Sequence, residues 1–265
     1  MAVLPPHTSI PAMLLAAGRG ERMRPLTDTC PKPLLTVQGK PLMQWPMEGL
    51  AQGGFDRVVV NTAWLGQAIE DHFLSHFGLQ PPSDMREQLL NQEHSATGLT
   101  IQYSREGQDF GAALETAGGI ARALPLLGDV FWVLAGDVFA PDFVFSQDAV
   151  NRFVASDQLA HLWLVPNPEH NPRGDFGLGP APHDAHKVAL ALNLPKDGTQ
   201  PLYTYSTIGL YRASLFRAPW CDIPAGNPGG VKAALAPLLR AAMDQGKVSA
   251  ELYTGRWTDV GTPER

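Results

Sequence analysis

A short apolar run that ends in a glycine-rich loop near the N-terminus constrains this chain more than any other feature. Residues 12–17 read AMLLAA, and Gly18 and Gly20 follow at once. Such a run is typical of a strand buried on both faces of a parallel sheet. Glycines after the strand let the backbone approach a ligand, and the N–H groups of the loop can bind an anion. The opening therefore predicts a strand that leads into an anion site.

Basic residues surround this loop. Arg19, Arg22, Arg24 and Lys32 can together hold a triphosphate and offset the charge that builds up on it. The loop is not a dinucleotide fingerprint, because residue 23 is methionine, and no Gly-Lys-Ser/Thr of a P-loop follows. The alternative is a plain strand-to-loop turn with a solvated basic rim. The basic residues and the Pro-Lys-Pro at 31–33 favour the phosphate site.

Strand-like and helix-like segments alternate along the first part of the chain. Further buried strands are expected at 57–61 and 130–135, and helices at 41–53, 64–77 and 115–124. This alternation predicts a doubly wound α/β sheet over about the first 150 residues. Later strands are expected at 159–166, 176–178, 188–194, 203–211 and 247–257, with a helix at 231–243 that contains Pro237. The polar stretch 80–98 is expected to be an insertion or a mobile loop.

Two aspartates follow strands of this predicted sheet. Asp137 comes after the run at 130–135, and Asp259 comes after the last expected strand. Ligands of open α/β sheets bind at the carboxyl ends of strands, and Mg²⁺ is held by a few carboxylates together with phosphate oxygens. Asp129 lies in a second Gly-Asp-Val tripeptide, at 128–130, which precedes its strand, so we expect it at the opposite edge of the sheet. Asp137 and Asp259 are therefore the candidate metal ligands.

Composition excludes several other classes of function. The formal net charge is −6, which argues against broad nucleic-acid binding, and no apolar run is long enough to cross a bilayer. Cys30 and Cys221 belong to no metal motif and are expected to be free, buried thiols of a cytosolic protein. His183 and His186 are spaced like a metal pair, but a solvated loop is the better interpretation of their Pro/Asp-rich surroundings. We expect a cytoplasmic monomer or small homo-oligomer that binds neither nucleic acid nor membrane.

The segment LAAGRGERMRPLT, followed by PKPL, resembles the signature of the sugar-phosphate nucleotidyltransferases. The resemblance covers essentially the whole chain and implies a Rossmann-like, mainly parallel sheet with a smaller sugar-binding subregion. It implies that Arg22 clamps the β- and γ-phosphates and that Lys32 contacts the phosphates of both substrates. Asp137 and Asp259 would hold Mg²⁺. The nucleotide would be held by Ala16, Ala17, Gly18, Arg19, Gly20, Glu115, Ala117 and Gly118.

The LETAGG segment at 114–119 narrows the resemblance further. Its glycines allow a flat base to approach the backbone, although a helix start with small residues for close packing is the alternative interpretation. The LETAGG form resembles that of family members acting on N-acetylmuramate 1-phosphate and of several heptose or mannose guanylyltransferases. The first of these is favoured by the segments 60–66, 103–107, 165–168 and 170–176 and by the closing YTGRWTDVGTPER. The resemblance places the sugar at Gly174, Asp175, Gly177 and Asn193. The Glu-Lys-Pro element of many relatives is altered at 193–196, and 108–113 looks inserted.

The reaction that this resemblance implies is transfer of UMP from UTP to N-acetylmuramic acid 1-phosphate, with release of pyrophosphate, in the recycling of peptidoglycan. We expect a single domain over 1–265, in which about 1–150 bind the nucleotide and about 151–265 bind the sugar and supply the second metal ligand. The alternatives are a guanylyl- or thymidylyltransferase for mannose, glucose or heptose phosphates, and a catalytically silent nucleotide-sugar sensor. The sensor is disfavoured because Arg22, Lys32 and both aspartates are present.

Overall fold

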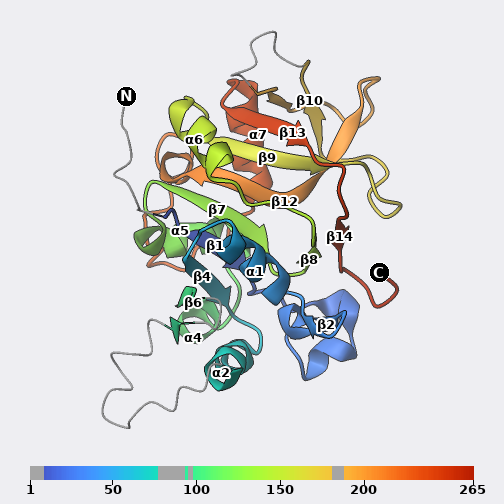
Figure 1. The fold of residues 1–265 in the computed structure, drawn as a ribbon. Coiled ribbons are helices and arrows are strands. Elements are labelled where there is room, and N and C mark those ends of the chain that lie inside the picture. Colours follow the sequence, from blue (N-terminus) through green and yellow to red (C-terminus); the bar gives the residue numbers. More distant parts are fainter. Residues whose placement is uncertain (1–8, 77–92, 95–97, 181–187) are drawn as a thin grey trace.

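The computed structural model describes residues 9–76, 93–94, 98–180 and 188–265. A sheet of 10 strands crosses the molecule in the order β11-β10-β12-β7-β1-β4-β6-β5, with β9 paired to β12 and β13. In Figure 1 most elements of the second half, yellow to red, lie above those of the first half, blue to green, while β14 lies beside β8. The sheet thus runs through both halves of the chain.

The strands of the main sheet are β1 (Ala12–Leu15), β4 (Arg57–Thr62), β5 (Glu93–His94), β6 (Thr100–Arg105), β7 (Val130–Ala135), β9 (Ala160–Val165), β10 (Phe176–Leu178), β11 (Ala191–Leu192), β12 (Leu202–Arg212) and β13 (Val248–Leu252). Two small ladders join β2 (Thr36–Val37) to β3 (Lys40–Pro41) and β8 (Val138–Phe139) to β14 (Thr258–Asp259).

The α-helices are α1 (Gln44–Gln52), α2 (Gly66–His76), α4 (Glu106–Phe110), α5 (Glu115–Leu127), α6 (Gln147–Ala155) and α7 (Leu235–Asp244). Short 3₁₀ turns are η1 (Glu21–Met23), η2 (Leu26–Asp28), η3 (Lys32–Leu34) and η4 (Ala213–Phe216).

The first half of the sheet is parallel, and its strands end level with one another. β1 lies between β4 and β7, and Leu15 is in register with Asn61 on one side and Ala135 on the other. β6 continues the parallel set beyond β4. The second half joins through the long strand β12, which runs antiparallel to β7, β9 and β10. The predicted mainly parallel α/β sheet is confirmed, with an antiparallel extension.

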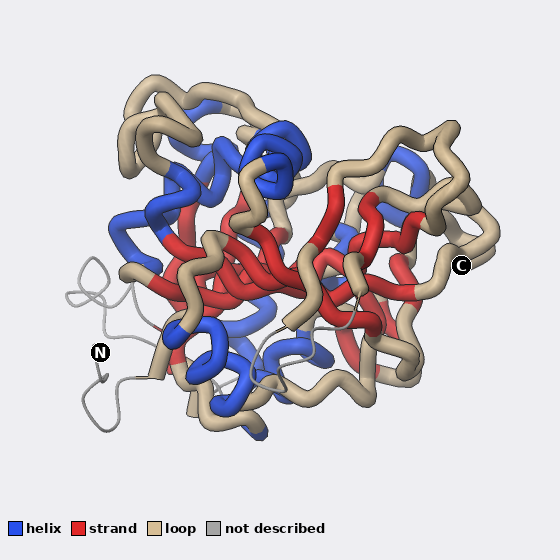
Figure 2. The backbone as a smooth tube through the Cα atoms, turned by 90° about the horizontal axis from the view of Figure 1, so that it is seen from above, coloured by secondary structure: helices blue, strands red, loops and turns tan. Residues whose placement is uncertain are grey.

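Helices cover both faces of the sheet, as expected for a doubly wound fold (Figure 2). One core packs side chains of α1, α2 and α6 against the sheet, among them Met47, Ile69 and Phe153. The other packs α5 and α7 against the opposite face, through Ile120 and Leu239 among others. Within the described residues no helix has both the length and the apolar character that a membrane crossing requires.

Several expected bounds need correction. The helix expected at 41–53 begins at Gln44, because Pro41 pairs with Thr36 in the β2–β3 hairpin. The strand expected at 188–194 is reduced to Ala191–Leu192, and the strand expected at 247–257 ends at Leu252. The sequence patterns did not indicate β6, α4 and α6.

The helix expected at 231–243 begins only at Leu235. The residues before it are extended, because Ala233 is hydrogen-bonded to the start of α5: its N–H donates to the Leu114 carbonyl, and its carbonyl accepts from the N–H of Ala117. Pro237 therefore falls in the first turn of α7, where backbone N–H groups have no partner within the helix.

Some expectations concern residues outside the described part of the chain. Most of the 80–98 stretch lies there, as do the histidines 183 and 186. Both cysteines are free thiols, as predicted. The predicted burial is confirmed for Cys221 and is wrong for Cys30, which is half-buried.

Candidate active site

A pocket of about 410 Å³ lies at the carboxyl ends of the parallel strands. It gathers the residues that follow β1, β4, β6 and β7, together with parts of α5 and β12. The lining residues are Leu15, Ala16, Ala17, Gly18, Gly20, Glu21, Arg22, Lys32, Pro33, Asn61, Glu106, Ala113, Glu115, Thr116, Ala135, Asp137, Thr207 and Gly261. The strand ends, where a ligand of an open α/β sheet is expected, thus border a real cavity.

The glycine loop forms one wall of this pocket. Gly20 adopts a left-handed conformation with φ of 67°, and its carbonyl accepts a hydrogen bond of 2.9 Å from the Thr27 hydroxyl. A Cβ at this position would lie 3.0 Å from the Thr27 methyl carbon and 3.1 Å from Lys32 Cβ. Both the backbone angle and the close packing therefore require glycine. Arg22 follows on η1 and is exposed at the rim of the pocket.

Lys32 and Asp137 meet at the floor of the pocket. The Lys32 side chain is largely buried, and its ammonium group forms an ion pair with the Asp137 carboxylate, which is one-third exposed. Asp137 is held beside the glycine loop because the N–H of Gly136 donates to the Leu15 carbonyl at 2.8 Å. A lysine and an aspartate from segments far apart in sequence thus form one charged pair that faces the cavity.

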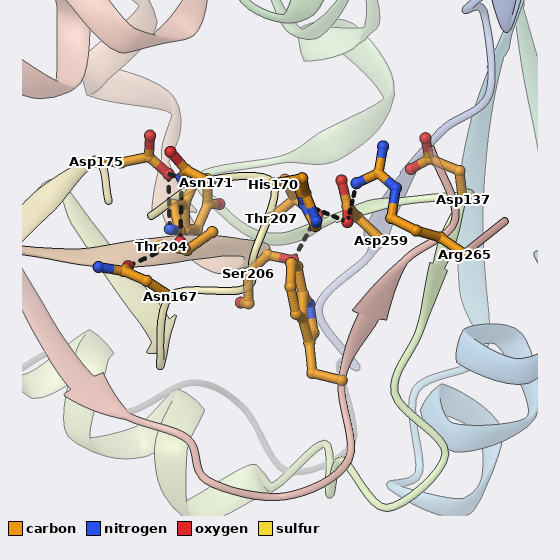
Figure 3. A network of polar contacts seen from close by, with 12 residues as sticks. Asp137, Asn167, His170, Asn171, Asp175, Thr204, Ser206, Thr207, Asp259 and Arg265 are labelled. Carbon is orange, nitrogen blue, oxygen red and sulfur yellow. Dashed lines mark hydrogen bonds and ion pairs between the residues drawn. The ribbon is translucent and has the colours of Figure 1, made fainter. Parts of the chain in front are cut away.

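Asp259 lies beside Asp137 because β14 pairs with β8. The Val260 N–H donates to the Asp137 carbonyl at 2.9 Å. Oδ1 of Asp259 faces two basic side chains, with His170 Nε2 at 2.8 Å and Arg265 Nη1 at 2.7 Å (Figure 3). Asp259 is not itself among the lining residues, although Gly261 is.

The two aspartates are the candidate metal ligands that the structure brings together. The described residues contain no cluster of three or more His, Cys, Asp or Glu side chains suited to a metal. Mg²⁺ needs no such cluster, because it is commonly held by one or two carboxylates with substrate phosphates and water. Two aspartates whose backbones are adjacent, one of them lining the pocket, therefore have the donor chemistry that suits this ion.

Three of the predicted nucleotide-binding residues do not line the pocket. The guanidinium of Arg19 stacks on the Trp64 ring at 3.9 Å and pairs with Glu21 at 2.8 Å. The N–H groups of Ala117 and Gly118 both donate to the Ala233 carbonyl, at 2.9 and 3.1 Å. These two residues therefore hold the segment before α7. The other five predicted residues, Ala16, Ala17, Gly18, Gly20 and Glu115, do line the cavity.

The four predicted sugar-side residues lie outside the pocket lining, and those on β10 and its preceding turn are involved in packing. Asp175 accepts hydrogen bonds from the Tyr205 N–H at 3.0 Å and from the Asn171 amide at 3.2 Å. Gly174 has φ of 61°, and Gly177 packs against Leu194. In Figure 3 Asp175 and Asn171 lie on the same side of the view as Asn167, with Asp259 and Asp137 beyond Thr207.

Asn193 is occupied by contacts with α7. Its amide donates to Asp244 at 2.9 Å, and its oxygen accepts from Arg240 at 2.6 Å. Arg240 also stacks on the Phe176 ring at 5.0 Å. In this structure Asn193 thus ties β11 and its following turn to the helix.

Several groups at the site were not identified from the sequence. Asn61 and Glu106 are buried at the pocket floor, where burial raises the pKa of the Glu106 carboxyl above its usual value, against the hydrogen bonds that it accepts from Asn61 and Leu114. Thr207 lines the pocket with φ of 63°, unusual for a β-branched residue. His170 is one of eight histidines scattered along the chain, and no motif around it indicates that it meets Asp259.

Comparison with known proteins agrees with this geometry. The family model described as Nucleotidyl transferase matches residues 11–265. N-acetylmuramate alpha-1-phosphate uridylyltransferase of Neisseria meningitidis is 45% identical over 253 residues, which cover 95% of this chain and 93% of the relative. The protein of the same name from Caulobacter vibrioides is 30% identical, with 96% and 92% covered. The UTP-bound UGPase of Acinetobacter baumannii shares the fold, with a TM-score of 0.68, 17% identity and 97% and 90% covered. The chain belongs to the nucleotidyl transferase family.

Proposed function

We propose that this protein transfers UMP from UTP to N-acetylmuramic acid 1-phosphate and releases pyrophosphate. The observation that carries the proposal is the 45% identity, over 95% of the chain, to a relative named for this reaction. A pocket that combines a glycine loop with Arg22, Lys32 and Asp137 supports nucleotidyl transfer in general. The product would be UDP-N-acetylmuramate, and the physiological role would be peptidoglycan recycling in the cytoplasm.

The chemistry is a direct in-line displacement. An oxygen of the sugar phosphate forms a bond to the α-phosphorus of UTP while the bond from that phosphorus to the bridging oxygen breaks, and the electron pair leaves with pyrophosphate. Two anions must approach each other, so fixed positive charge lowers the barrier. Lys32, which lines the pocket, is proposed to contact the phosphates of both UTP and the sugar 1-phosphate. Arg22, at the rim, is proposed to bind the β- and γ-phosphates and to stabilise the departing charge.

Asp137 and Asp259 are the proposed ligands of Mg²⁺. Their backbones are adjacent in the β8–β14 ladder, and carboxylates with substrate phosphates are the ligands that this ion prefers. When bound, Mg²⁺ would neutralise and orient the phosphate oxygens. In the structure Lys32 contacts the first carboxylate, and His170 and Arg265 contact the second.

The two substrates are proposed to approach from the two halves of the chain. Residues 16–20 and Glu115, within about 1–150, would bind the nucleotide. Residues of about 151–265 would bind the sugar, with the turn that contains Gly174 and Asp175 near the sugar ring. Thr207 lines the pocket from β12, the strand that joins the halves, and fits a position between the two substrates.

An activity matrix tests the proposed reaction. UTP, GTP and dTTP are each incubated with the 1-phosphates of N-acetylmuramate, glucose, mannose and heptose, with and without MgCl₂, and pyrophosphate release is measured. We expect the highest kcat/KM for UTP with N-acetylmuramate 1-phosphate and no turnover without the metal. A preference for GTP or dTTP would support the alternative transferases, and no turnover with any pair would support a sensor.

The metal assignment is tested with a matched pair of variants. Asp137→Asn should lower turnover by orders of magnitude with the fold intact, because it removes one of two anionic ligands. Asp129→Asn makes the same change in the other Gly-Asp-Val tripeptide, at the opposite end of β7, and should keep near-normal turnover. Near-normal turnover of Asp137→Asn would refute the assignment.

A further inference from the structure

Asn61 and Glu106 form a buried hydrogen-bonded chain in the lining of the pocket. Oδ1 of Asn61 accepts from the Ala16 N–H at 2.8 Å, and Nδ2 of Asn61 donates to Oε1 of Glu106 at 2.7 Å. Oε2 of Glu106 accepts from the Leu114 N–H at 2.7 Å. Glu106 is 0% exposed and Asn61 3% exposed. The chain thus links the start of the glycine loop to the residue immediately before Glu115.

The direction of every hydrogen bond in this chain is fixed by its ends. Ala16 and Leu114 contribute backbone N–H groups, which can only donate. The Asn61 oxygen must therefore face Ala16, its amino group must face Glu106, and both Glu106 oxygens must accept. Rotating the Asn61 amide by half a turn would set two donors against each other at Ala16. No alternative arrangement of these two side chains satisfies all four groups.

The pair is tightly packed on the side of α5, while on its other side it lines the pocket. A Cβ on Gly119 would lie 2.6 Å from Oε1 of Glu106 and 3.0 Å from Nδ2 of Asn61, so α5 packs directly on the pair. Buried polar groups without partners are costly, so the loss of any of these hydrogen bonds would disfavour the observed arrangement. The two side chains therefore form a direct bridge between the glycine loop and LETAGG.

We propose that Asn61 and Glu106 are positioning residues that hold the two nucleotide-binding segments at the separation that a nucleoside triphosphate requires. The inference rests on the proposed function. The triphosphate would lie at the glycine loop and the base at Glu115, so the nucleotide is the ligand that touches both segments. The sugar phosphate would contact the other half of the chain. A change in the separation should thus weaken the binding of the nucleotide more than that of the sugar phosphate.

A charge-exchange experiment separates this role from general stability. In Glu106→Gln the new amino group must face either Asn61 Nδ2 or the Leu114 N–H, and both are donors. In Asn61→Asp a second carboxylate oxygen would face Glu106 Oε1. The double variant Asn61→Asp/Glu106→Gln restores every bond: the new carboxylate accepts from Ala16 and from the new amide, whose oxygen accepts from Leu114. It also keeps the net charge and nearly the same volume.

Steady-state kinetics, UTP binding by calorimetry and the midpoint of thermal unfolding are measured for all variants. Each single variant should raise the KM for UTP about tenfold, equivalent to about 1.4 kcal/mol, and change the KM for the sugar phosphate little. The double variant should return the KM for UTP to near the wild-type value. Asn151→Asp, at an exposed position on α6, is the matched control and should match the wild type.

The outcomes distinguish the inference from the proposed function. Wild-type protein that neither binds UTP nor turns over refutes the proposed function, and the inference falls with it. Normal UTP binding by both single variants refutes the inference alone, as does a double variant no better than the singles. Equal losses of affinity for both substrates would also refute it. If a single variant does not fold, the double variant decides, because all of its bonds are satisfied.

Discussion

His161 should make the stability of this protein depend on pH in a defined direction. It lies on β9 with 5% of its surface exposed, and its Nδ1 is 3.0 Å from the Ser249 hydroxyl. Burial, and to a smaller extent the charge of Arg152, lowers its pKa from 6.5 to about 3. The Glu251 carboxylate, 4.0 Å from Nε2, would favour the charged form, but it is partly exposed and the desolvation of the imidazole dominates.

The sign of the effect follows from proton linkage. The unfolded chain binds a proton at His161 near pH 6.5, and the folded chain does so only near pH 3. The contribution to stability is therefore complete above pH 6.5 and is lost as the pH falls toward 3. Each pH unit in this window corresponds to about 1.4 kcal/mol, so the loss at pH 4.5 is on the order of 3 kcal/mol.

Urea titrations at pH 7.0, 5.5 and 4.5 measure this loss. Other groups also titrate, so the informative quantity is the difference between wild type and His161→Gln, which has no imidazole. Between pH 7.0 and 4.5 the free energy of unfolding should fall less in the variant than in the wild type, by on the order of 3 kcal/mol. Ser249→Ala keeps the imidazole and should keep the wild-type pH dependence. Parallel curves for wild type and His161→Gln would refute the reasoning.

Two further predictions concern glycine and the left-handed region of the backbone. Gly118→Ala should lower the free energy of unfolding, measured by urea titration, by about 1–3 kcal/mol, because the new Cβ would collide with the Val231 carbonyl. Gly18→Ala is the control: nothing lies within 4 Å of its new Cβ, so the free energy of unfolding should change little. Gln38 has φ of 53° in the two-residue β2–β3 turn, a conformation that asparagine tolerates better. Gln38→Asn should therefore stabilise the protein by roughly 0.5 kcal/mol and raise the midpoint of thermal unfolding. An unchanged or lower midpoint would contradict this.

The parts of the fold that could be predicted are those with a local signal. The run at 130–135 is β7 to the residue, because a buried parallel strand is apolar throughout and a Gly-Asp turn ends it. The start of α7 could not be predicted, because Ala233 is held extended by hydrogen bonds to α5, far away in sequence. Pro237 looks misplaced in the sequence and is well placed in the structure for the same reason.

In the candidate site, too, features with a local sequence signal could be predicted, and features set by contacts distant in sequence could not. Arg22, Lys32 and Asp137 line the pocket as the motifs predict, although their roles stay predictions. Ala117 and Gly118 were expected to face a base, but their N–H groups are already bonded to Ala233. A glycine in a motif indicates that another group lies close to the backbone, but it does not indicate whether that group is a ligand or another part of the chain. Here the approaching group is the chain itself.

The position of Asp137 follows from its place after a parallel strand, and the positions of Asn61 and Glu106 follow from the same rule once β6 is included. Side chains that follow parallel strands gather at one edge of the sheet. Asp137 follows β7, Asn61 lies near the end of β4, and Glu106 follows β6. Residues 100–105 alternate polar and apolar side chains, as a half-buried strand does, but the run is short and follows a polar stretch, and it is not among the predicted strands. Without β6 beside β4, nothing brings Glu106 to Asn61. β6 and α4, which the sequence patterns do not indicate, therefore bring Glu106 to the same edge of the sheet as Asn61 and Asp137.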